Sequence, residues 1–526
     1  MLRIPTSTAL PLFDTVATRT LEQQAAARLP EHCLMQRAGM GLARLARAIA
    51  PHANRIWIAC GPGNNGGDGL QAAAWLQQHL NTMPARSCNC RILVSCVHER
   101  DRMPADARAA WDAAHKAGVQ WIAHMPPDMG PQDLCIDALL GIGLRRPDTA
   151  SPPTRKDDRL LPLLRSLQSG ISPVLCVDIA SGLDADTGQY LPGFEPMNLP
   201  VSARHTLALL TLQPGLFTGS GRDACGQIWW DDLDTGLASS APPFAISPCA
   251  QLFSPEARAP RPHASHKGSF GDVAILGGEG LEHRGLSMTG AAWLAALAAL
   301  HGGAGRVMLA LLDASHGSGQ AISPWPEIML RSPEAQDWRG ATVVCGCGGG
   351  MAVRAWLPQI LDQAPRLVLD ADALNAVAED ESLALLLKER SRRSQHTVLT
   401  PHPLEAARLL KMSTAQVQAQ RLSAARQLAL QFNCTALLKG SGTVIAGPQG
   451  DGNASPPCWI NPTGNARLST GGTGDVLAGL IAALGAQGLD SAQAATLAAW
   501  RHGHAADQWP AQMPFSASAL AQRLGQ

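Results

Sequence analysis

Residues 471–475, with the sequence GGTGD, and the apolar run 476–484 behind them constrain this chain more than any other stretch. The run is long enough for a helix, which predicts that the amides of Thr473, Gly474 and Asp475 lie at its N-terminus. Unpaired amides at that place favour an anion, above all a phosphate. Asp475 could then take a proton from a hydroxyl while the amides hold a phosphoryl group. A glycine loop that only caps a buried helix would show the same pattern.

The composition sets limits on the architecture and on the partners. A chain of 526 residues is too long for one ordinary core, so we expect two or more domains. The chain has 42 Lys+Arg and 42 Asp+Glu, so its formal net charge is zero. It therefore has no net positive field to attract nucleic acid or an anionic membrane. We find no leader and no apolar run of membrane-spanning length. The 13 Cys lack the spacing of zinc or redox sites, which favours a reduced, cytoplasmic protein.

The first half contains three predicted strands that each end in a polar loop. Residues 55–60 lead into GPGNNGGDGL at 61–70, and the other two strands end at Asp137 and Asp178. The carboxyl ends of parallel strands meet at one edge of a sheet, so we expect Asp68, Asp137 and Asp178 around one crevice. Amides and carboxylates there suit a cation or a polar ring better than a bare phosphate. Each aspartate alone could instead cap the following helix.

The second half alternates strands with helices, which predicts a mainly parallel sheet covered by helices. Its polar clusters also follow strands, and they include Asp370, His402 and Lys439. Each has a plain alternative, because Asp370 could cap a helix, His402 could start one, and Lys439 could lie in a solvated turn. The set together, with several glycine turns on one edge, favours a ligand site.

The three loops of the first half resemble those of the NAD(P)H-hydrate epimerase family, and the similarity covers residues 13–232. This family interconverts the R and S forms of NADH or NADPH that has added water at C6 of its nicotinamide ring. The resemblance implies a Rossmann-like, three-layer α/β/α domain, and it implies a potassium ion held by Asn65, Asp137 and Ser181. Asp178 would touch the reacting ring, and we interpret it as the group that transfers the proton. The hydrate would also be bound by Asn64, Asn65, Gly66, Gly67, Asp68, Gly141, Ile142, Gly143, Leu144, Arg145, Arg146 and Pro147.

Residues 263–508 resemble the ADP-dependent NAD(P)H-hydrate dehydratases, a branch of the ribokinase-like α/β fold. The matching stretches include WPEIM, CGCGGG, LVLDADALN, VLTPHPLEAARLL and LLKGSGTVIAGP, in this order along the chain. Asp475 would act at the reacting hydroxyl, and the sequence departs from the family pattern at Cys347, Gly349 and Leu404. The resemblance implies hydrate contacts at Ala291, Gly350, His402 and Asp475. It implies a nucleotide site at Lys439, Gly440, Ser441, Gly442, Thr443 and Gly474.

We therefore predict a bifunctional repair enzyme, an isomerase and a lyase, with an epimerase domain at 1–235, a linker at 236–262 and a dehydratase domain at 263–526. The second domain would use ADP with Mg²⁺ to dehydrate the S hydrate, which gives AMP and phosphate, and the first would use K⁺. We expect small-molecule substrates, a homo-oligomer, and neither nucleic acid nor a membrane as partner. Two alternatives are a small-molecule kinase of the ribokinase-like class and a first half that is only an interaction module.

Overall fold

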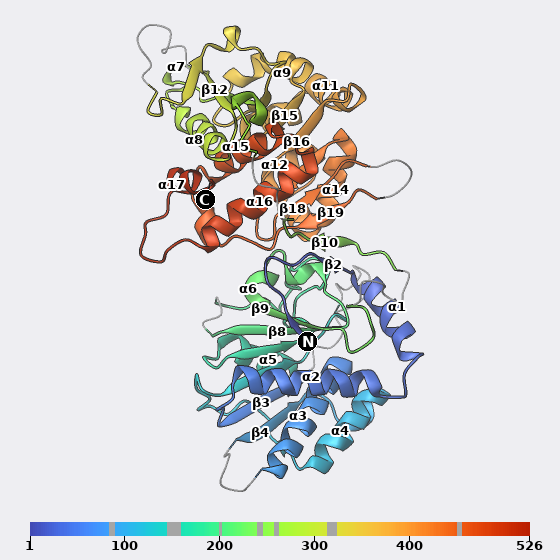
Figure 1. Cartoon of the computed structure of the whole chain (residues 1–526). Coiled ribbons are helices and arrows are strands. Elements are labelled where there is room, and N and C mark those ends of the chain that lie inside the picture. Colours follow the sequence, from blue (N-terminus) through green and yellow to red (C-terminus); the bar gives the residue numbers. More distant parts are fainter. Residues whose placement is uncertain are drawn as a thin grey trace. The chain divides into compact units, whose positions relative to one another are not determined.

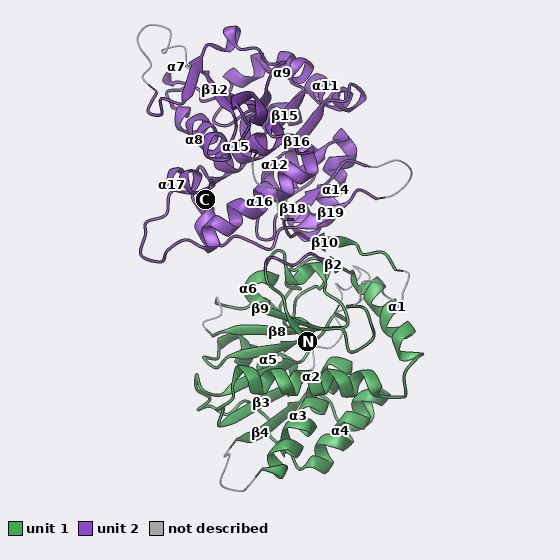
Figure 2. Cartoon of the chain, in the orientation of Figure 1, with its two compact units in different colours: residues 1–5, 11–250 green, residues 6–10, 251–526 purple. Residues whose placement is uncertain are grey.

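A computed structural model describes residues 1–83, 90–144, 159–198, 202–238, 246–256, 262–312, 323–449 and 455–525 (Figure 1). The chain divides into two compact units, which Figure 2 colours separately. Unit 1 contains Met1–Pro5 and Pro11–Ala250, and unit 2 contains Thr6–Leu10 and Gln251–Gln526. Each unit has its own apolar core. Within the described ranges, no helix combines the length and the apolar content needed to cross a bilayer.

Unit 1 is built on an eight-stranded sheet with the order β1-β9-β8-β7-β6-β3-β4-β5. All neighbours in this order pair in parallel, except β1 and β9, which are antiparallel. The strands are β1 (Leu2–Arg3), β3 (Arg55–Cys60), β4 (Arg91–Cys96), β5 (Gln120–Trp121), β6 (Leu134–Ala138), β7 (Val174–Val177), β8 (Arg204–Leu209) and β9 (Gln227–Asp231). The helices are α1 (Thr15–Ala26), α2 (Cys33–Ile49), α3 (Asn64–Thr82), α4 (Ala105–Ala117), α5 (Leu160–Ser169) and α6 (Gly221–Cys225).

Both faces of this sheet are covered, as the continuous apolar strands predict. Ile56 and Ile58 of β3 belong to the core that α2, α3 and α4 cover, and Figure 1 shows these helices side by side. Trp57 points to the opposite face because side chains alternate along a strand, and it is also fully buried. A parallel sheet that is buried on both faces is the centre of three layers, so the predicted three-layer α/β/α fold is confirmed.

Unit 2 is built on the larger part of an eleven-stranded sheet with the order β13-β12-β11-β14-β15-β16-β17-β18-β19-β10-β2. The division of the chain falls inside β2 and β10, so Pro11, Leu12 and Ala250 of these strands belong to unit 1. From β13 to β17 all neighbours are parallel, and β18 pairs in antiparallel fashion with both β17 and β19. The strands are β2 (Leu10–Leu12), β10 (Ala250–Leu252), β11 (Asp272–Gly277), β12 (Arg306–Leu311), β13 (Ile328–Arg331), β14 (Thr342–Cys345), β15 (Arg366–Leu369), β16 (His396–Leu399), β17 (Thr435–Leu438), β18 (Val444–Ala446) and β19 (Cys458–Ile460). The predicted, mainly parallel sheet is therefore confirmed.

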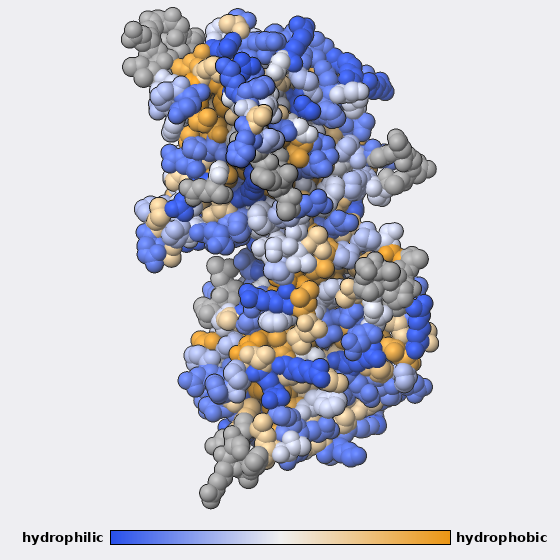
Figure 3. Space-filling model, in the orientation of Figure 1, coloured by the Kyte–Doolittle hydropathy of each residue, from blue (hydrophilic) through white to orange (hydrophobic). Residues whose placement is uncertain are grey.

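Helix α15 (Thr473–Ala486) is the central helix of unit 2. It is buried along almost its whole length and packs against α8 (Thr289–His301) and α16 (Ser491–Asp507). The contact with α8 is very close, because a Cβ atom at Gly479 would lie 2.0 Å from the carbonyl oxygen of Ala295. The other helices are α7 (Leu281–Arg284), α9 (Leu357–Gln363), α10 (Ala371–Glu379), α11 (Glu381–Arg392), α12 (Pro403–Leu410), α13 (Thr414–Ala419), α14 (Arg421–Phe432) and α17 (Ala517–Arg523). Hydrophilic residues cover most of the face that Figure 3 shows.

Candidate active sites

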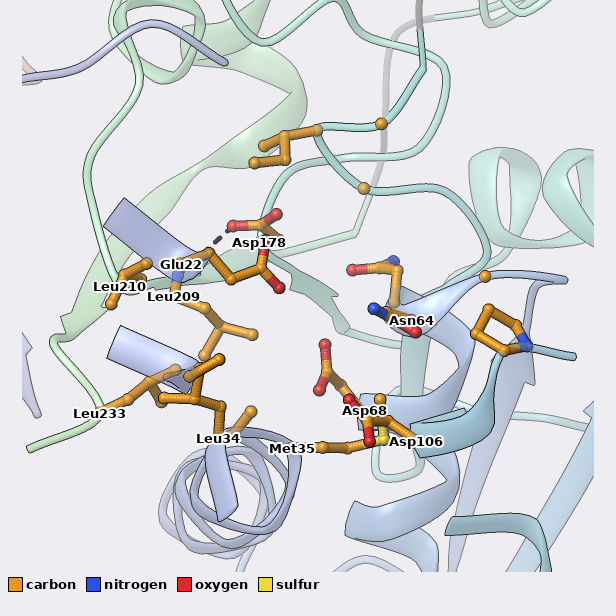
Figure 4. A pocket seen from close by; sticks show the side chains of 18 of the residues that line it. Glu22, Leu34, Met35, Asn64, Asp68, Asp106, Asp178, Leu209, Leu210 and Leu233 are labelled. Atoms are coloured by element: carbon orange, nitrogen blue, oxygen red, sulfur yellow. Dashed lines mark hydrogen bonds between the residues drawn. The ribbon is translucent and has the colours of Figure 1, made fainter. Parts of the chain in front are cut away.

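Unit 1 contains a cavity of about 860 Å³ at the carboxyl edge of its sheet (Figure 4). The loops after β3, β6 and β7 supply one part of its wall, and α1 and the start of α2 supply another. The predicted residues that line it are Asn64, Asn65, Asp68, Gly141, Ile142, Gly143, Leu144 and Asp178. Arg145, Arg146 and Pro147 lie outside the described residues.

Gly66 and Gly67 are not among the lining residues, and their surroundings explain why glycine is needed there. A Cβ atom at Gly66 would lie 2.1 Å from the carbonyl oxygen of Gly61, and one at Gly67 would lie 2.6 Å from Cε of Met35. Both glycines are buried in the first turn of α3. They allow this helix to approach the preceding loop and α2, which gives both glycines a packing role, and their contact with the hydrate stays a prediction.

Asp178 occupies an unusual position directly after β7. Its φ of 69° is in the left-handed region, which is uncommon for a residue other than glycine and is often found at functional sites. The backbone N–H of Leu209 donates to Oδ1 over 3.4 Å. Burial raises the pKa of Asp178 to about 7, and the nearby charge of Glu22 adds to the rise. A carboxyl group with such a pKa can both accept and donate a proton near neutral pH.

Further carboxyl groups line the same cavity as Asp178, and Figure 4 labels three of them: Glu22, Asp68 and Asp106. Burial and the charges of Asp178, Glu22 and Asp106 raise the pKa of Asp68 well above its usual range. Burial also raises the pKa of Glu22. Asp106 is held by His32, whose Nδ1 lies 2.5 Å from its Oδ1. No motif in the sequence points to Glu22, His32 or Asp106 as cavity residues.

Asp137 and Ser181 form a buried cluster beside the cavity. The hydroxyl of Ser181 donates to Asp137 Oδ1 over 2.6 Å, and its backbone N–H donates to Oδ2 over 3.0 Å. Burial raises the pKa of Asp137, although the hydrogen bonds from Ser181 and Leu139 act in the opposite direction. The Nδ2 of Asn65 is buried and has no hydrogen-bond partner among the described residues. The oxygens of Asn65, Asp137 and Ser181 are the ligand type that a hard cation prefers.

Asp475 lies in the first turn of α15, at the carboxyl edge of the second sheet. Burial raises its pKa to about 7, the charge of Asp370 adds to the rise, and Cys347 and Lys439 oppose it. A Cβ atom at Gly474 would lie 3.4 Å from the ammonium nitrogen of Lys439, which places this cation at the helix N-terminus. Amides and an ammonium group at one point favour an anionic ligand.

Lys439 is bound to Asp370, which follows β15. Its Nζ donates to Asp370 Oδ1 over 2.7 Å, and Thr400 Oγ1 donates to the same oxygen over 2.9 Å. Burial acts to lower the pKa of Lys439, but Asp370 and Glu405 raise it above its usual value. Asp370 stands at the N-cap position of α10 without a capping bond from its side chain. The alternatives of a solvated Lys439 and a capping Asp370 are therefore wrong.

Cys347 completes a cluster with the two aspartates of unit 2. Its sulfur and one carboxylate oxygen of each of Asp370 and Asp475 lie within 4.8 Å of one another. Lys439 already offsets the negative charge of this group through its bond to Asp370 Oδ1. Burial and the charges of Asp475 and Asp370 raise the pKa of Cys347 well above its usual range, so the thiol stays protonated.

His402 is the N-cap of α12. Its Nδ1 accepts from the backbone N–H groups of Leu404 and Glu405 over 3.1 and 3.3 Å. An Nδ1 that accepts leaves the proton on Nε2, which lies 3.3 Å from Glu405 Oε1. The helix-start alternative for His402 is therefore correct, and a contact with the hydrate would come from the exposed part of the ring.

Gly350 lies against a buried glutamate, Glu279, and Ala291 lies against Gly348 of the same glycine turn. A Cβ atom at Gly350 would lie 2.0 Å from Glu279 Oε2, and one at Gly348 would lie 3.0 Å from Cβ of Ala291. Glu279 is fully buried, and it accepts from the backbone N–H of Met351 over 2.8 Å. It also accepts from Arg284 Nε over 2.6 Å. This carboxylate therefore ties the glycine turn after β14 to α7.

The comparisons with known proteins identify both halves of the chain. Residues 31–215 match the model of the YjeF-related protein N-terminus, and residues 275–526 match that of NAD(P)H-hydrate dehydratase. The chain is 33% identical over 493 residues to the bifunctional NAD(P)H-hydrate repair enzyme of Escherichia coli K12. The aligned region covers 90% of this chain and 84% of that protein. The corresponding enzyme of Coxiella burnetii is 31% identical over 94% of both chains.

A further relative matches only the second half of this chain. The ADP-dependent (S)-NAD(P)H-hydrate dehydratase of Neisseria meningitidis is 41% identical over 253 residues, which are 47% of this chain and 80% of that protein. The identity to full-length bifunctional relatives extends through both units. The chain therefore belongs to the family of bifunctional NAD(P)H-hydrate repair enzymes, with an epimerase unit followed by a dehydratase unit.

Proposed function

We propose that unit 1 interconverts the R and S hydrates of NADH and NADPH and that unit 2 uses ADP to return the S hydrate to the reduced coenzyme. One observation carries this proposal: Asp475, with a pKa of about 7, lies at the N-terminus of α15, where Lys439 also points. An acid–base group beside an anion site suits phosphoryl transfer to an alcohol. A dehydratase that accepts only the S hydrate does not consume the R hydrate. The epimerase converts the R hydrate into the S hydrate, which the dehydratase can then use.

In the proposed dehydration, Asp475 accepts the proton of the C6 hydroxyl while this oxygen attacks the β-phosphorus of ADP. AMP leaves, and the amides of Thr473 and Gly474 together with Lys439 stabilise the charge on the moving phosphoryl group. The lone pair of the ring nitrogen then expels phosphate, a far better leaving group than hydroxide, which leaves an iminium ion. Loss of a proton from the neighbouring C5 to solvent restores the dihydropyridine. The necessary Mg²⁺ would be held by phosphate oxygens and water, and it would supply positive charge beside the moving phosphoryl group.

The assay that tests both activities supplies mixed R and S hydrates with ADP and follows the absorbance of the reduced nicotinamide. We expect both hydrates to be consumed, with AMP and phosphate as co-products. A stable phosphorylated product without recovery of the coenzyme would support the small-molecule kinase instead. Consumption of the S hydrate alone, with the R hydrate left to its spontaneous rate, would support a first half that is only an interaction module.

The pH dependence of dehydration should report the ionisation of Asp475. The carboxylate form accepts the proton, and burial raises its pKa to about 7. The ionised fraction, and with it kcat/KM, should therefore fall about tenfold for each pH unit below 7. The measurement is kcat/KM for the S hydrate between pH 5.5 and 8.5.

A control is needed because burial also raises the pKa of Glu405 to about 7. Glu405→Gln removes that titration, so the midpoint of the profile should stay in place even if the overall rate changes. A flat profile, or a midpoint that disappears in Glu405→Gln, would count against Asp475 as the base.

The epimerase unit is proposed to hold K⁺ between Asn65, Asp137 and Ser181. The buried carboxylate of Asp137 accepts hydrogen bonds only from Ser181 and Leu139 among the described residues, so a cation beside it would offset the cost of burial. The bound ion would supply a fixed positive charge at the cavity wall, and the residues of this chain would orient the hydrate there.

Replacement of K⁺ by tetramethylammonium should lower epimerisation, because the larger ion does not fit among these oxygens. Ser181→Ala should raise the K⁺ concentration for half-maximal epimerisation by about 10–100-fold. The matched control is dehydration of pure S hydrate by the same samples, which should not change. Equal epimerisation rates in both salts would show that epimerisation does not require K⁺.

A further inference from the structure

Arg421 is a buried arginine at the start of α14, directly behind the loop of residues 439–443. Its side chain is 2% exposed. Its Nη2 donates to the carbonyl oxygens of Leu438, Lys439 and Gly442 over 3.3, 3.2 and 3.4 Å. A single guanidinium nitrogen therefore donates to three carbonyl oxygens, which belong to the two ends of the loop.

The loop backbone lies directly against this guanidinium group. Gly440 has a φ of 138°, and a Cβ atom there would lie 2.9 Å from Nη1 of Arg421. A side chain at position 440 would therefore be strained and would also push the loop away from Arg421. Nη1 itself donates to Gln418 Oε1 over 2.7 Å, which fixes the orientation of the planar group.

Holding these carbonyls also fixes two amides on the other side of the loop. The C=O of Lys439 shares a peptide plane with the N–H of Gly440, and the C=O of Gly442 shares one with the N–H of Thr443. In a trans peptide the two groups point in opposite directions. Because both carbonyls point to Arg421, both N–H groups point away from it, and such amides are suitable for binding a phosphate.

We infer that Arg421 is a positioning residue for the nucleotide, which sets the amides of Gly440 and Thr443 in the orientation that binds ADP. The inference rests on the proposed nucleotide role of residues 439–443. Arg421 does not touch the ligand itself, because the loop lies between them. Its loss should therefore weaken ADP binding and leave the chemical step and the hydrate site largely unchanged.

Arg390 provides a matched control in the same unit. Its side chain is 1% exposed, and it donates to the carbonyl oxygens of Leu361 and Ala364 over 2.7 and 2.9 Å. Burial lowers the pKa of both arginines to about 10. The two residues differ in what they hold, since the carbonyls that Arg390 binds belong to the end of α9 and to His396 at the start of β16, and none of them belongs to the loop of residues 439–443.

The experiment compares Arg421→Lys with Arg390→Lys in the full-length chain. Lysine keeps the charge, but its side chain is shorter and it lacks the second nitrogen that donates to Gln418 and orients the group. Arg421→Lys should therefore raise the Kd and the KM for ADP about tenfold. The KM for the S hydrate and kcat at saturating ADP should stay within about twofold of wild type, since neither depends on the loop amides as directly. Arg390→Lys should lower Tm and leave the Kd for ADP unchanged.

Three results would overturn the inference: an unchanged Kd in Arg421→Lys, an equal rise in both variants, or a loss in kcat alone. If Arg421→Lys does not fold, Gln418→Ala decides, because it removes only the bond that orients the guanidinium group. The Kd for ADP should then rise about threefold, and an unchanged Kd would refute the role of Arg421. A wild-type chain that neither binds ADP nor dehydrates the hydrate would refute the proposed function instead.

Discussion

Asp475→Asn should lower the rate of dehydration about 10²–10⁴-fold, which is the range for the loss of a general base. Asparagine has nearly the same shape as aspartate but cannot accept the proton of the C6 hydroxyl. The N-terminus of α15 and its amides stay in place, so ADP should still bind. The measurement is single-turnover formation of NADH from pure S hydrate, beside the Kd for ADP from calorimetry.

Epimerisation by the same variant is the internal control for Asp475→Asn. The two acid–base groups lie in different units, each with its own sheet and core, so the interconversion of R and S hydrates should continue at the wild-type rate. A dehydration rate within tenfold of wild type would show that Asp475 is not the base. Loss of both activities in a folded chain would contradict two independent sites.

The strand ends of this fold could be predicted because parallel strands have a clear signature in the sequence. A short apolar run followed at once by glycine or aspartate occurs at β3, β6 and β7, and these strands are neighbours in the order β7-β6-β3. The edge of a parallel sheet then brings their loops together. For this reason Asp68 and Asp178 were correctly placed at one cavity, with Asp137 beside it.

The helices that close the cavity gave no such signal. Glu22 and Asp106 lie on α1 and α4, where a charged residue usually belongs to a solvated face, and their place at the cavity depends on how these helices pack. The same holds for Arg421, whose function as a donor to carbonyls appears only when α14 lies behind the loop. Tertiary packing decides such contacts, and a single sequence does not contain that information in a local pattern.

The pair of Asp370 and Lys439 is an intermediate case. Both residues directly follow strands, β15 and β17, so the rule for parallel sheets put them on the same edge. They are separated by β16 alone, but the order of strands in a sheet is not a local property of the chain. Their ion pair could therefore be proposed only as one of several pairings, and capping or solvation remained equally reasonable.

Asp178→Asn should lower epimerisation about 10²–10⁴-fold and leave dehydration of pure S hydrate unchanged. Asparagine is the suitable replacement because it tolerates the left-handed backbone at this position better than alanine. With mixed hydrates and ADP, the variant should consume the S form quickly and then stop, with the R form left to its spontaneous rate.

The comparison for Asp178→Asn is Asp106→Asn, which alters a carboxyl group of the same cavity. Asp106 is already bound to His32, and its loss should cost less than about tenfold. Equal losses in both variants would mean that the total charge of the cavity matters more than any single acid. If Asp178→Asn still clears both hydrates at the wild-type rate, the proton must move through another group, and Glu22 and Asp68 are the carboxyl groups that remain beside it.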